Sequence, residues 1–436
     1  MRPVLVLLGL VFPASAQYAG PAILSRGEAP VAMSAPQISF RPFLEITGLY
    51  DTGLAAVTVN SQGGLANQSS VGVAVAWGIS GMHSWRHTRL GLDYRGSINH
   101  YAQSSGYDSL DQSLLLGLTH QLSRHILFSL RTSAGIFTRD FGLNGLPQTV
   151  PFDPTTASIP TTDFFDNRTM YVTSTADLVL QESTRLSFDF GGTGSVVRRR
   201  STALDGTTSA NAHGDLQYRL TRRATIGASY NYYHFDFTHI FGGTDVHAVT
   251  GTFAMQLSRM VEITGFAGFA RAESNFIQLV PIDPVIAALL GITEGTQVVH
   301  TVDYVPNLSV RLSRTFRRGV AYASGGHTIV PGNGLFLTSY ATTVLGGYNY
   351  TGVRRWSLGT QVSFSRSNSI GNIIGTYSNI SGSLSASRQL FPSVHFIAIY
   401  SARQYDSPDF ANYNRLVHEA RIGLGWAPGD VPLRIW

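Results

Sequence analysis

Arginine side chains are the chemically distinctive groups of this sequence. All 31 basic residues are arginines, because the 436 residues include no lysine. A guanidinium binds a carboxylate or phosphate through two parallel hydrogen bonds, so arginines that converge on one surface can select anionic solutes without a catalytic group. A compositional bias of the whole chain would also produce an arginine-only set. The arrangement of the arginines in space therefore decides whether they have a function.

The elements that must position these arginines show the alternation of a β-strand. Segments of about ten to fifteen residues alternate apolar with small or polar side chains, which is the period of a strand with two different faces. In residues 126–139, Phe128 and Leu130 lie on one face, and Ser129, Arg131 and Ser133 lie on the other. One face suits lipid and the other suits water.

The same alternation assigns a set of arginines to the water-facing side, as predicted lumen-lining residues that would set selectivity. They are Arg89, Arg95, Arg131, Arg139, Arg185, Arg219, Arg311, Arg355, Arg403, Arg415 and Arg421. Acidic residues share this side, among them Asp93, Asp177, Asp189, Asp215, Glu262, Asp303 and Glu419. The arginines therefore attract anions, or they pair with the acids and brace the inner wall.

The connections between the segments alternate between short and long. Short turns with a shared Ser/Thr-Arg pattern are predicted at 122–124, 182–185, 220–223, 257–259, 312–314 and 386–388. Longer connections are predicted near 101–110, 140–167, 199–207, 238–244, 272–298, 329–335, 368–375 and 405–413. Tight turns at one end and long loops at the other are typical of an antiparallel, up-and-down transmembrane β-barrel, here of about 18 strands with 16–18 expected. An array of soluble, secreted β-sandwiches is the alternative all-β fold.

The N-terminal residues predict export. Arg2, the apolar residues 4–12 and Ala14-Ser15-Ala16 form the three parts of a cleavable signal peptide, residues 1–16. We expect an irregular periplasmic segment at 17–42, the barrel at 43–427 and a C-terminal tail at 428–436. Only 13% of the residues are charged, about half of what a soluble globular protein carries. The absence of cysteine excludes disulfide scaffolds and thiolate metal sites.

The two longest predicted loops share a short phrase. It reads Val150-Pro151-Phe152-Asp153-Pro154 in the first loop and Val280-Pro281-Ile282-Asp283-Pro284 in the second. Long barrel loops can fold inward, so Asp153 and Asp283 are candidate constriction residues. Alternatively, both are proline-stiffened surface loops.

The C-terminal strand carries a resemblance. Residues 421–426, Arg-Ile-Gly-Leu-Gly-Trp, alternate as a strand, and the chain ends Arg434-Ile435-Trp436. In this respect the sequence resembles bacterial outer-membrane β-barrel proteins, in which a terminal aromatic residue is recognised by the assembly machinery. Either Trp426 closes the barrel before a short tail, or Trp436 is the terminal signal. Size and charge resemble porins and the barrels associated with exopolysaccharide export.

Other functions have little support in the sequence. His83 and His87 are four residues apart in a strand or turn, which does not align them as a helix would, so we expect no metal site. Serine and aspartate are too frequent for any catalytic set to stand out, and we predict no enzyme and no cofactor. An exported chain without a basic helix argues against nucleic-acid binding.

The sequence thus predicts a pore or export conduit in the bacterial outer membrane for anionic or sugar-like solutes, with exopolysaccharide as the favoured cargo. Its expected partners are outer-membrane lipid and lipopolysaccharide, the assembly machinery and, for an export conduit, periplasmic polysaccharide-export components. Arg198-Arg199-Arg200, at a predicted extracellular end, could meet lipopolysaccharide or be simply solvated. The alternatives are a barrel enzyme acting on lipid or peptide, and a non-conducting structural or adhesive barrel.

Overall fold

A computed structural model describes residues 38–59, 65–102, 105–138, 168–200, 204–238, 241–281, 294–331, 337–350, 352–370, 375–408, 414–428 and 431–433. The predicted signal peptide at 1–16 and the residues Arg139, Asp153, Asp283 and Trp436 lie outside these ranges. In the described part, one short 3₁₀ turn, η1 (Ser105–Tyr107), accompanies the strands. Across the described residues, helices long and apolar enough to span a membrane are not found.

The strands follow one another along the whole described chain. They are β1 (Ile38–Val59), β2 (Leu65–Ser84), β3 (Thr88–Tyr101), β4 (Ser109–Gln121), β5 (Ile126–Phe137), β6 (Thr169–Gln181), β7 (Leu186–Arg199), β8 (Thr207–Thr221), β9 (Ala224–Phe237), β10 (Gly242–Ser258), β11 (Val261–Pro281), β12 (Glu294–Phe316), β13 (Gly319–Val330), β14 (Ser339–Tyr350), β15 (Trp356–Ser369), β16 (Thr376–Phe391), β17 (Val394–Asp406), β18 (Arg415–Trp426) and the short β19 (Val431–Leu433).

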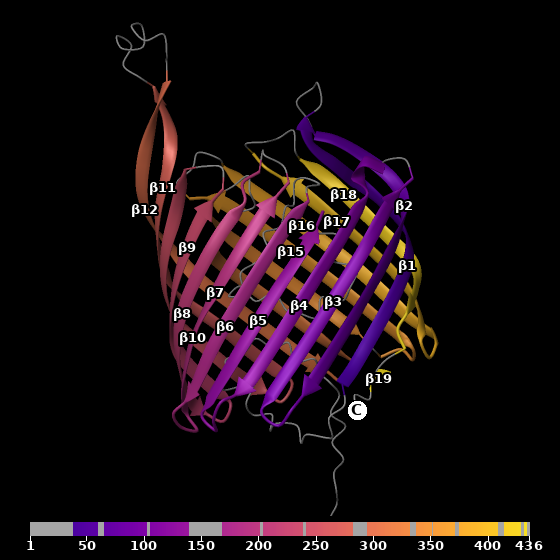
Figure 1. Cartoon of the computed structure of the whole chain (residues 1–436), viewed down its shortest axis with the longest axis horizontal. Helices are drawn as coiled ribbons and strands as arrows, with labels where there is room; N and C mark the ends of the chain where they lie inside the picture. Colours follow the sequence, from indigo (N-terminus) through magenta and orange to yellow (C-terminus); the bar gives the residue numbers. More distant parts are fainter. Residues whose placement is uncertain are drawn as a thin grey trace, which may run out of the picture.

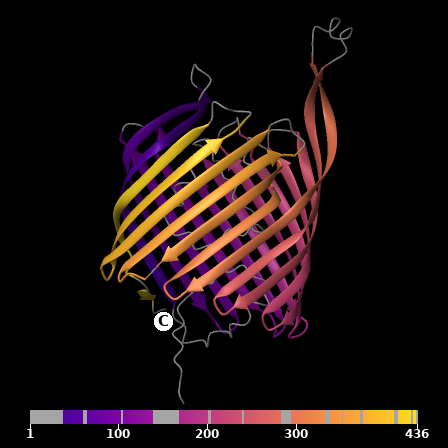
Figure 2. The same ribbon diagram turned by 180° about the vertical axis from the view of Figure 1, so that it is seen from behind.

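The sheet closes on itself as an antiparallel barrel. Each strand from β1 to β17 pairs with the next one, and β18 pairs back with β1, from Leu44 opposite Trp426 to Asp51 opposite Glu419. The strands tilt against the barrel axis (Figures 1 and 2), as closure of a sheet requires. The predicted all-β barrel of about 18 strands is confirmed.

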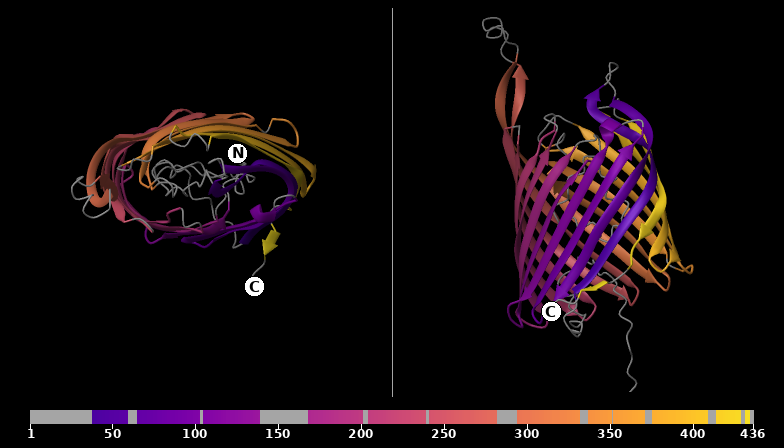
Figure 3. Two further views of the ribbon diagram at one scale, coloured as in Figure 1. Left: turned by 90° about the horizontal axis from the view of Figure 1, so that it is seen from above. Right: turned by 45° about the vertical axis from the view of Figure 1, so that its right-hand side comes forward.

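The two faces of the wall differ as the alternation predicts. Apolar side chains point outward and are exposed, for example Ile46, Val249, Val362, Leu384 and Ile422. The intervening residues point inward and are mostly small or polar. Seen from above, the wall has an oval outline (Figure 3). The inner face is therefore the place where polar chemistry can act on a solute.

Two predicted turns and one predicted connection are wrong. β12 continues to Phe316 and β16 to Phe391, so 312–314 and 386–388 are strand rather than turn. In β12 the residues Leu312-Ser313-Arg314 continue the alternation of the strand. Leu312 is exposed on the outer face, and Arg314, two residues further along, stacks over the Phe316 ring at 4.7 Å. The connection predicted at 272–298 is also largely strand, because β11 and β12 pair as far as Pro281 and Glu294. This hairpin rises above the rest of the barrel (Figure 1).

Both ends of the barrel differ from the predicted boundaries. β1 begins at Ile38 rather than at residue 43, because Ser39 and Phe40 already pair with Met82 and Gly81 of β2. Within the predicted tail, β19 pairs with Ile38–Phe40 of β1. A backbone with free hydrogen-bonding groups at a strand edge gains by such pairing.

Candidate functional site

The candidate site is the inner wall of the barrel, onto which most predicted arginines project. By the alternation of the strands, the inward-facing ones are Arg89 and Arg95 of β3, Arg131 of β5, Arg219 of β8, Arg311 of β12, Arg403 of β17, and Arg415 and Arg421 of β18. Arg185 and Arg355 lie instead in the tight turns after β6 and β14. Arg355 has a positive φ of 66°, a left-handed conformation typical of turns. These two arginines are therefore placed at the barrel rim rather than along the wall.

Two of the inward arginines form ion pairs with carboxylates of their own strands. In β3, Arg95 Nε and Nη2 donate to the two carboxylate oxygens of Asp93 at 2.8 and 2.9 Å. In β18, Arg421 Nε donates to Glu419, and these side chains are only 8% and 6% exposed. Paired in this way, each arginine presents little net charge to a passing solute.

Two further inward-facing arginines, one on β17 and one on β18, lie beside one tyrosine. Arg403 and Arg415 hold their guanidinium carbons 5.9 and 5.1 Å from the centre of the Tyr405 ring, and Arg403 Nη1 also donates to Tyr405 Oη at 3.3 Å. Tyr405 is almost fully buried. Cations over an aromatic face are attracted by its quadrupole. Tyr405 thus helps to fix the direction of both arginines.

Because β17, β18, β1, β2 and β3 are neighbours in the closed sheet, these groups belong to one area. We call it the charged wall, and it consists of Glu45, Asp51, Asp93, Arg95, Arg403, Arg415, Glu419 and Arg421. It contains as many carboxylates as arginines. The numbers of charges are balanced here, which favours the alternative in which arginines and acids pair and brace the inner wall over the alternative in which the arginines attract anions.

A second area of the inner wall, not predicted from the sequence, is rich in hydroxyl groups. On β15 the inward residues include Ser363, Ser365, Ser367 and Ser369, and on β16 they include Ser381, Ser383, Ser385 and Ser387. Ser363 and Ser381 hydrogen-bond across the two strands at 2.6 Å. The signal was present as serine at every second position in 363–369 and 381–387. We call this area the serine wall.

Apolar side chains narrow the lumen near the rim opposite the tight turns. Phe235, Val246 and Ala270 of β9, β10 and β11 pack with Ile370, which follows β15. β15 is not adjacent to β9–β11 in the sheet, so this contact crosses the interior of the barrel.

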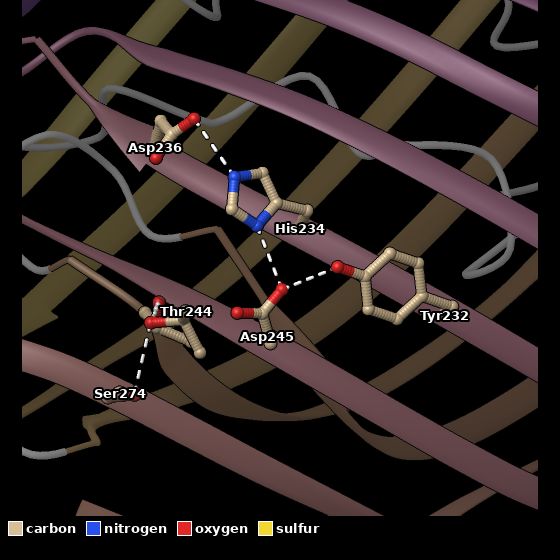
Figure 4. A network of polar contacts seen from close by, with 7 residues as sticks. Tyr232, His234, Asp236, Thr244, Asp245 and Ser274 are labelled. Carbon is tan, nitrogen blue, oxygen red and sulfur yellow. Dashed lines mark hydrogen bonds and ion pairs between the residues drawn. The ribbon is translucent and has the colours of Figure 1, made fainter. Parts of the chain in front are cut away.

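A chain of hydroxyl groups lies next to this apolar contact. Thr338, just before β14, donates to Thr244 of β10 at 2.6 Å. Thr244 in turn shares a 3.0 Å hydrogen bond with Ser274 of β11 (Figure 4). The three side chains are buried. The segment leading into β14 is thereby held against the inner wall, which makes this part of the lumen a constriction.

The opposite face of β9 and β10 carries a separate polar network. Asp245 accepts hydrogen bonds from Tyr232 Oη at 2.6 Å and from His234 Nδ1 at 2.8 Å, while His234 Nε2 lies 3.0 Å from Asp236 (Figure 4). These residues alternate with inward-facing Tyr233 and Phe235, so they point outward. The network is therefore not part of the lumen.

The arginine run at the end of β7 is divided between the two faces. Arg199 is buried and its Nη1 donates to the backbone oxygen of Asp205, whereas Arg198 and Arg200 are exposed. Contact with lipopolysaccharide remains a prediction for the two exposed arginines.

The predicted C-terminal residues are placed in part. Trp426 is the last residue of β18 and lies opposite Leu44 of β1 and Val394 of β17. It thus stands at the seam that closes the barrel. Its role as an assembly signal, and that of Trp436, remains a prediction, as do the constriction roles of Asp153 and Asp283.

Comparisons with known proteins give structural likeness only. No protein-family model and no curated protein matches the sequence. Among solved structures, Pseudomonas aeruginosa OccK5 (OpdH) aligns at 14% identity and a TM-score of 0.44, over 92% of this chain and 98% of that one. A BenF-like porin from Pseudomonas fluorescens Pf-5 aligns at 10% and 0.41, over 90% and 99%. The copper transporter OprC aligns at 10% and 0.44, over 91% and 67%.

Proposed function

We propose that this protein is an integral outer-membrane barrel that conducts hydrophilic, sugar-like solutes through a water-filled lumen. The observation that carries the proposal is the closed sheet with an apolar outer face and a polar inner face. Such a wall leaves no unpaired strand edge in the hydrocarbon, where each unpaired backbone group would cost several kcal/mol. Water-soluble proteins rarely expose so large a continuous apolar surface.

The orientation follows from the positions of the turns. Tight turns of outer-membrane barrels face the periplasm and the longer connections face outward. On this assignment the constriction at Thr244, Thr338 and Ile370 lies near the extracellular mouth. The exposed ends of β6–β8, with Arg198 and Arg200, then stand at the level where lipopolysaccharide is met. On the same assignment Trp426 lies at the periplasmic side, and we propose that the assembly machinery recognises it there.

The serine wall and the charged wall both favour sugar-like solutes over simple anions. Sugars present many hydroxyl groups, and the serine wall offers donors and acceptors that can exchange hydrogen bonds with them in succession. The charged wall offers carboxylates and guanidinium groups in equal number, and two of its arginines are paired with carboxylates, so it binds hydroxyl groups without attracting one sign of charge strongly. Among sugars we keep exopolysaccharide as the favoured cargo, which would require periplasmic export components as partners.

Liposome swelling tests this proposal. Vesicles that contain the folded barrel are expected to swell in iso-osmotic solutions of neutral disaccharides, and at least as fast as in solutions of a monovalent sugar acid of the same size. Substituting Ser363→Leu and Ser381→Leu together should slow swelling with a disaccharide, because two hydrogen-bonding groups and some width are lost.

The matched control is Val362→Leu, which changes the outer face of the same strand and should leave the swelling rate unchanged. Vesicles that contain heat-modifiable, folded barrel and yet do not swell in any of these sugars would contradict the proposed function. Faster permeation of the sugar acid than of the neutral sugar would restore the anion-selective alternative.

A further inference from the structure

Four side chains with metal-binding groups meet on the inner wall at β6, β7 and β8, away from the charged wall. Asp189 of β7 lies directly opposite Asp215 of β8, and His213 of β8 lies opposite Gly191, which in turn pairs with Asp177 of β6. One ligand atom each from Asp189, His213 and Asp215 lies within 4.8 Å of the others. In addition, His213 Nε2 lies 3.7 Å from Asp177 Oδ1.

A glycine creates the space for this arrangement. A Cβ atom at Gly191 would overlap both Asp177 Oδ1 and His213 Cε1. The imidazole of His213 therefore lies over the backbone of β7 and reaches toward the carboxylate of β6. Any other residue at 191 would push the histidine and Asp177 apart. Because Gly191 has no side chain, the metal-binding groups of three strands can approach one another closely.

The electrostatics of the cluster favour a cation. Three carboxylates, those of Asp177, Asp189 and Asp215, lie around the single imidazole of His213, and like charges at this spacing repel one another unless a cation lies among them. Serine hydroxyls already hydrogen-bond to two of these carboxylates. Ser129 donates to Asp177 Oδ2 at 3.2 Å, and Ser229 hydrogen-bonds to Asp215. The Asp215 Oδ1 atom is buried and has no hydrogen-bond partner among the described residues. A buried carboxylate oxygen without a donor is costly unless a cation binds it.

We propose that Asp189, His213 and Asp215 bind a divalent transition-metal ion of the zinc type on the lumen wall, with Asp177 within reach as a further ligand. One imidazole nitrogen with carboxylate oxygens, and no thiolate, suits Zn²⁺ and its neighbours rather than Ca²⁺ or Mg²⁺. Zinc bonds of about 2.0–2.2 Å place its ligand atoms about 3.4 Å apart, which modest side-chain rotations achieve from the present spacing.

The site is half-buried and opens to the lumen, so an ion can enter from solution and keep a position for water or a solute oxygen. Such an open position is the feature that distinguishes a ligand-exchanging zinc site from a closed structural one. The hydrogen bonds from Ser129 and Ser229 orient the carboxylates around the ion. The prediction of no metal site rested on the spacing of His83 and His87. The ligands proposed here come from three strands and form no local motif.

Isothermal titration calorimetry tests the proposal. ZnCl₂ is titrated into chelator-treated, folded barrel in detergent, and the heat of binding is measured. The wild type is expected to bind one Zn²⁺ per chain, and His213→Gln and Asp215→Asn are each expected to weaken binding at least about tenfold. The matched controls are His247→Gln on the outer face and Asp303→Asn on the inner face of β12, which should bind as the wild type does.

Zinc-edge X-ray absorption of the wild-type complex gives a second measurement that does not depend on variants folding. It should show one imidazole nitrogen and otherwise oxygen ligands. The proposal is overturned if the wild type takes up no stoichiometric Zn²⁺, if the bound ion shows no imidazole, or if folded His213→Gln binds Zn²⁺ with unchanged affinity. The last outcome would leave His213 as an ion-pair partner of Asp177 alone.

Discussion

Replacing Arg421 with methionine is expected to lower the free energy of unfolding of the barrel by about 3–5 kcal/mol. The guanidinium and the Glu419 carboxylate are both almost fully buried and hydrogen-bonded to each other. Methionine has a similar length and no charge, so the variant leaves the Glu419 carboxyl group without its ion-pair partner in a site that water scarcely reaches. An uncompensated buried charge is strongly destabilising, even where the intact pair adds little net stability.

Urea unfolding of the barrel in lipid vesicles, followed by tryptophan fluorescence, measures this loss. The double variant Glu419→Met, Arg421→Met should recover about 1 kcal/mol or more of it, because no unpaired charge remains. Arg89→Met removes an exposed inner-face arginine and should stay within about 0.5 kcal/mol of the wild type. If Arg421→Met were no less stable than Arg89→Met, the buried ion pair within β18 would not stabilise the barrel.

Arginine at position 362 is expected to destabilise the barrel in a bilayer by about 2–4 kcal/mol, the cost of placing this side chain on the lipid face near mid-depth. Val362 lies midway along β15 and is 59% exposed on the outer face. Its neighbours across the two adjacent strands are Gly346 and Gly382, which offer the guanidinium no partner. The energy of unfolding in vesicles gives the size of the effect.

The control for this variant is the adjacent residue. Gln361→Arg places the same side chain on the inner face, in contact with water, and should change the stability by less than about 0.5 kcal/mol. Equal effects of Val362→Arg and Gln361→Arg would mean that the two faces of β15 meet the same solvent. In that case the outer face would not be lipid-facing, and the soluble all-β alternative would have to be reconsidered.

The barrel itself could be predicted from the sequence because one local rule governs it. A wall between lipid and water forces alternation at every second residue, as in 126–137, and this signal survives without knowledge of which strands pair. The positions of the tight turns followed from the same rule at 122–124, 182–185, 220–223 and 257–259. The rule failed at 312–314 and 386–388, where a turn-like composition also satisfies the strand alternation.

Contacts between distant strands could not be predicted, because they depend on register. The pairing of Asp51 with Glu419 joins the two ends of the chain, and no periodicity reveals such a partner. The same limit applies to the constriction, in which Thr338 reaches Thr244 at a separation of 94 residues. The long β11–β12 hairpin was missed for another reason. Outside the bilayer a strand need not alternate sharply, so residues 272–298 had the composition of a loop.

The residue types of the inner wall could be predicted from the sequence, but the pairs that these residues form could not. Alternation correctly directs Arg95 and Arg421 inward, yet only the structure shows that Asp93 and Glu419 neutralise them. The serine wall was visible in the alternation of 363–369 and 381–387 but carried no charge to draw attention to it. The cluster around His213 required the register of β6, β7 and β8, together with the missing side chain of Gly191.

A water-filled lumen that crosses the membrane is tested most directly by single-channel recording in planar bilayers. Folded, heat-modifiable protein is expected to insert in discrete conductance steps whose size rises in proportion to salt concentration. Because the arginines of the charged wall are matched by carboxylates, the reversal potential in a salt gradient should lie near zero. Failure of well-folded protein to produce any conductance steps would contradict the account.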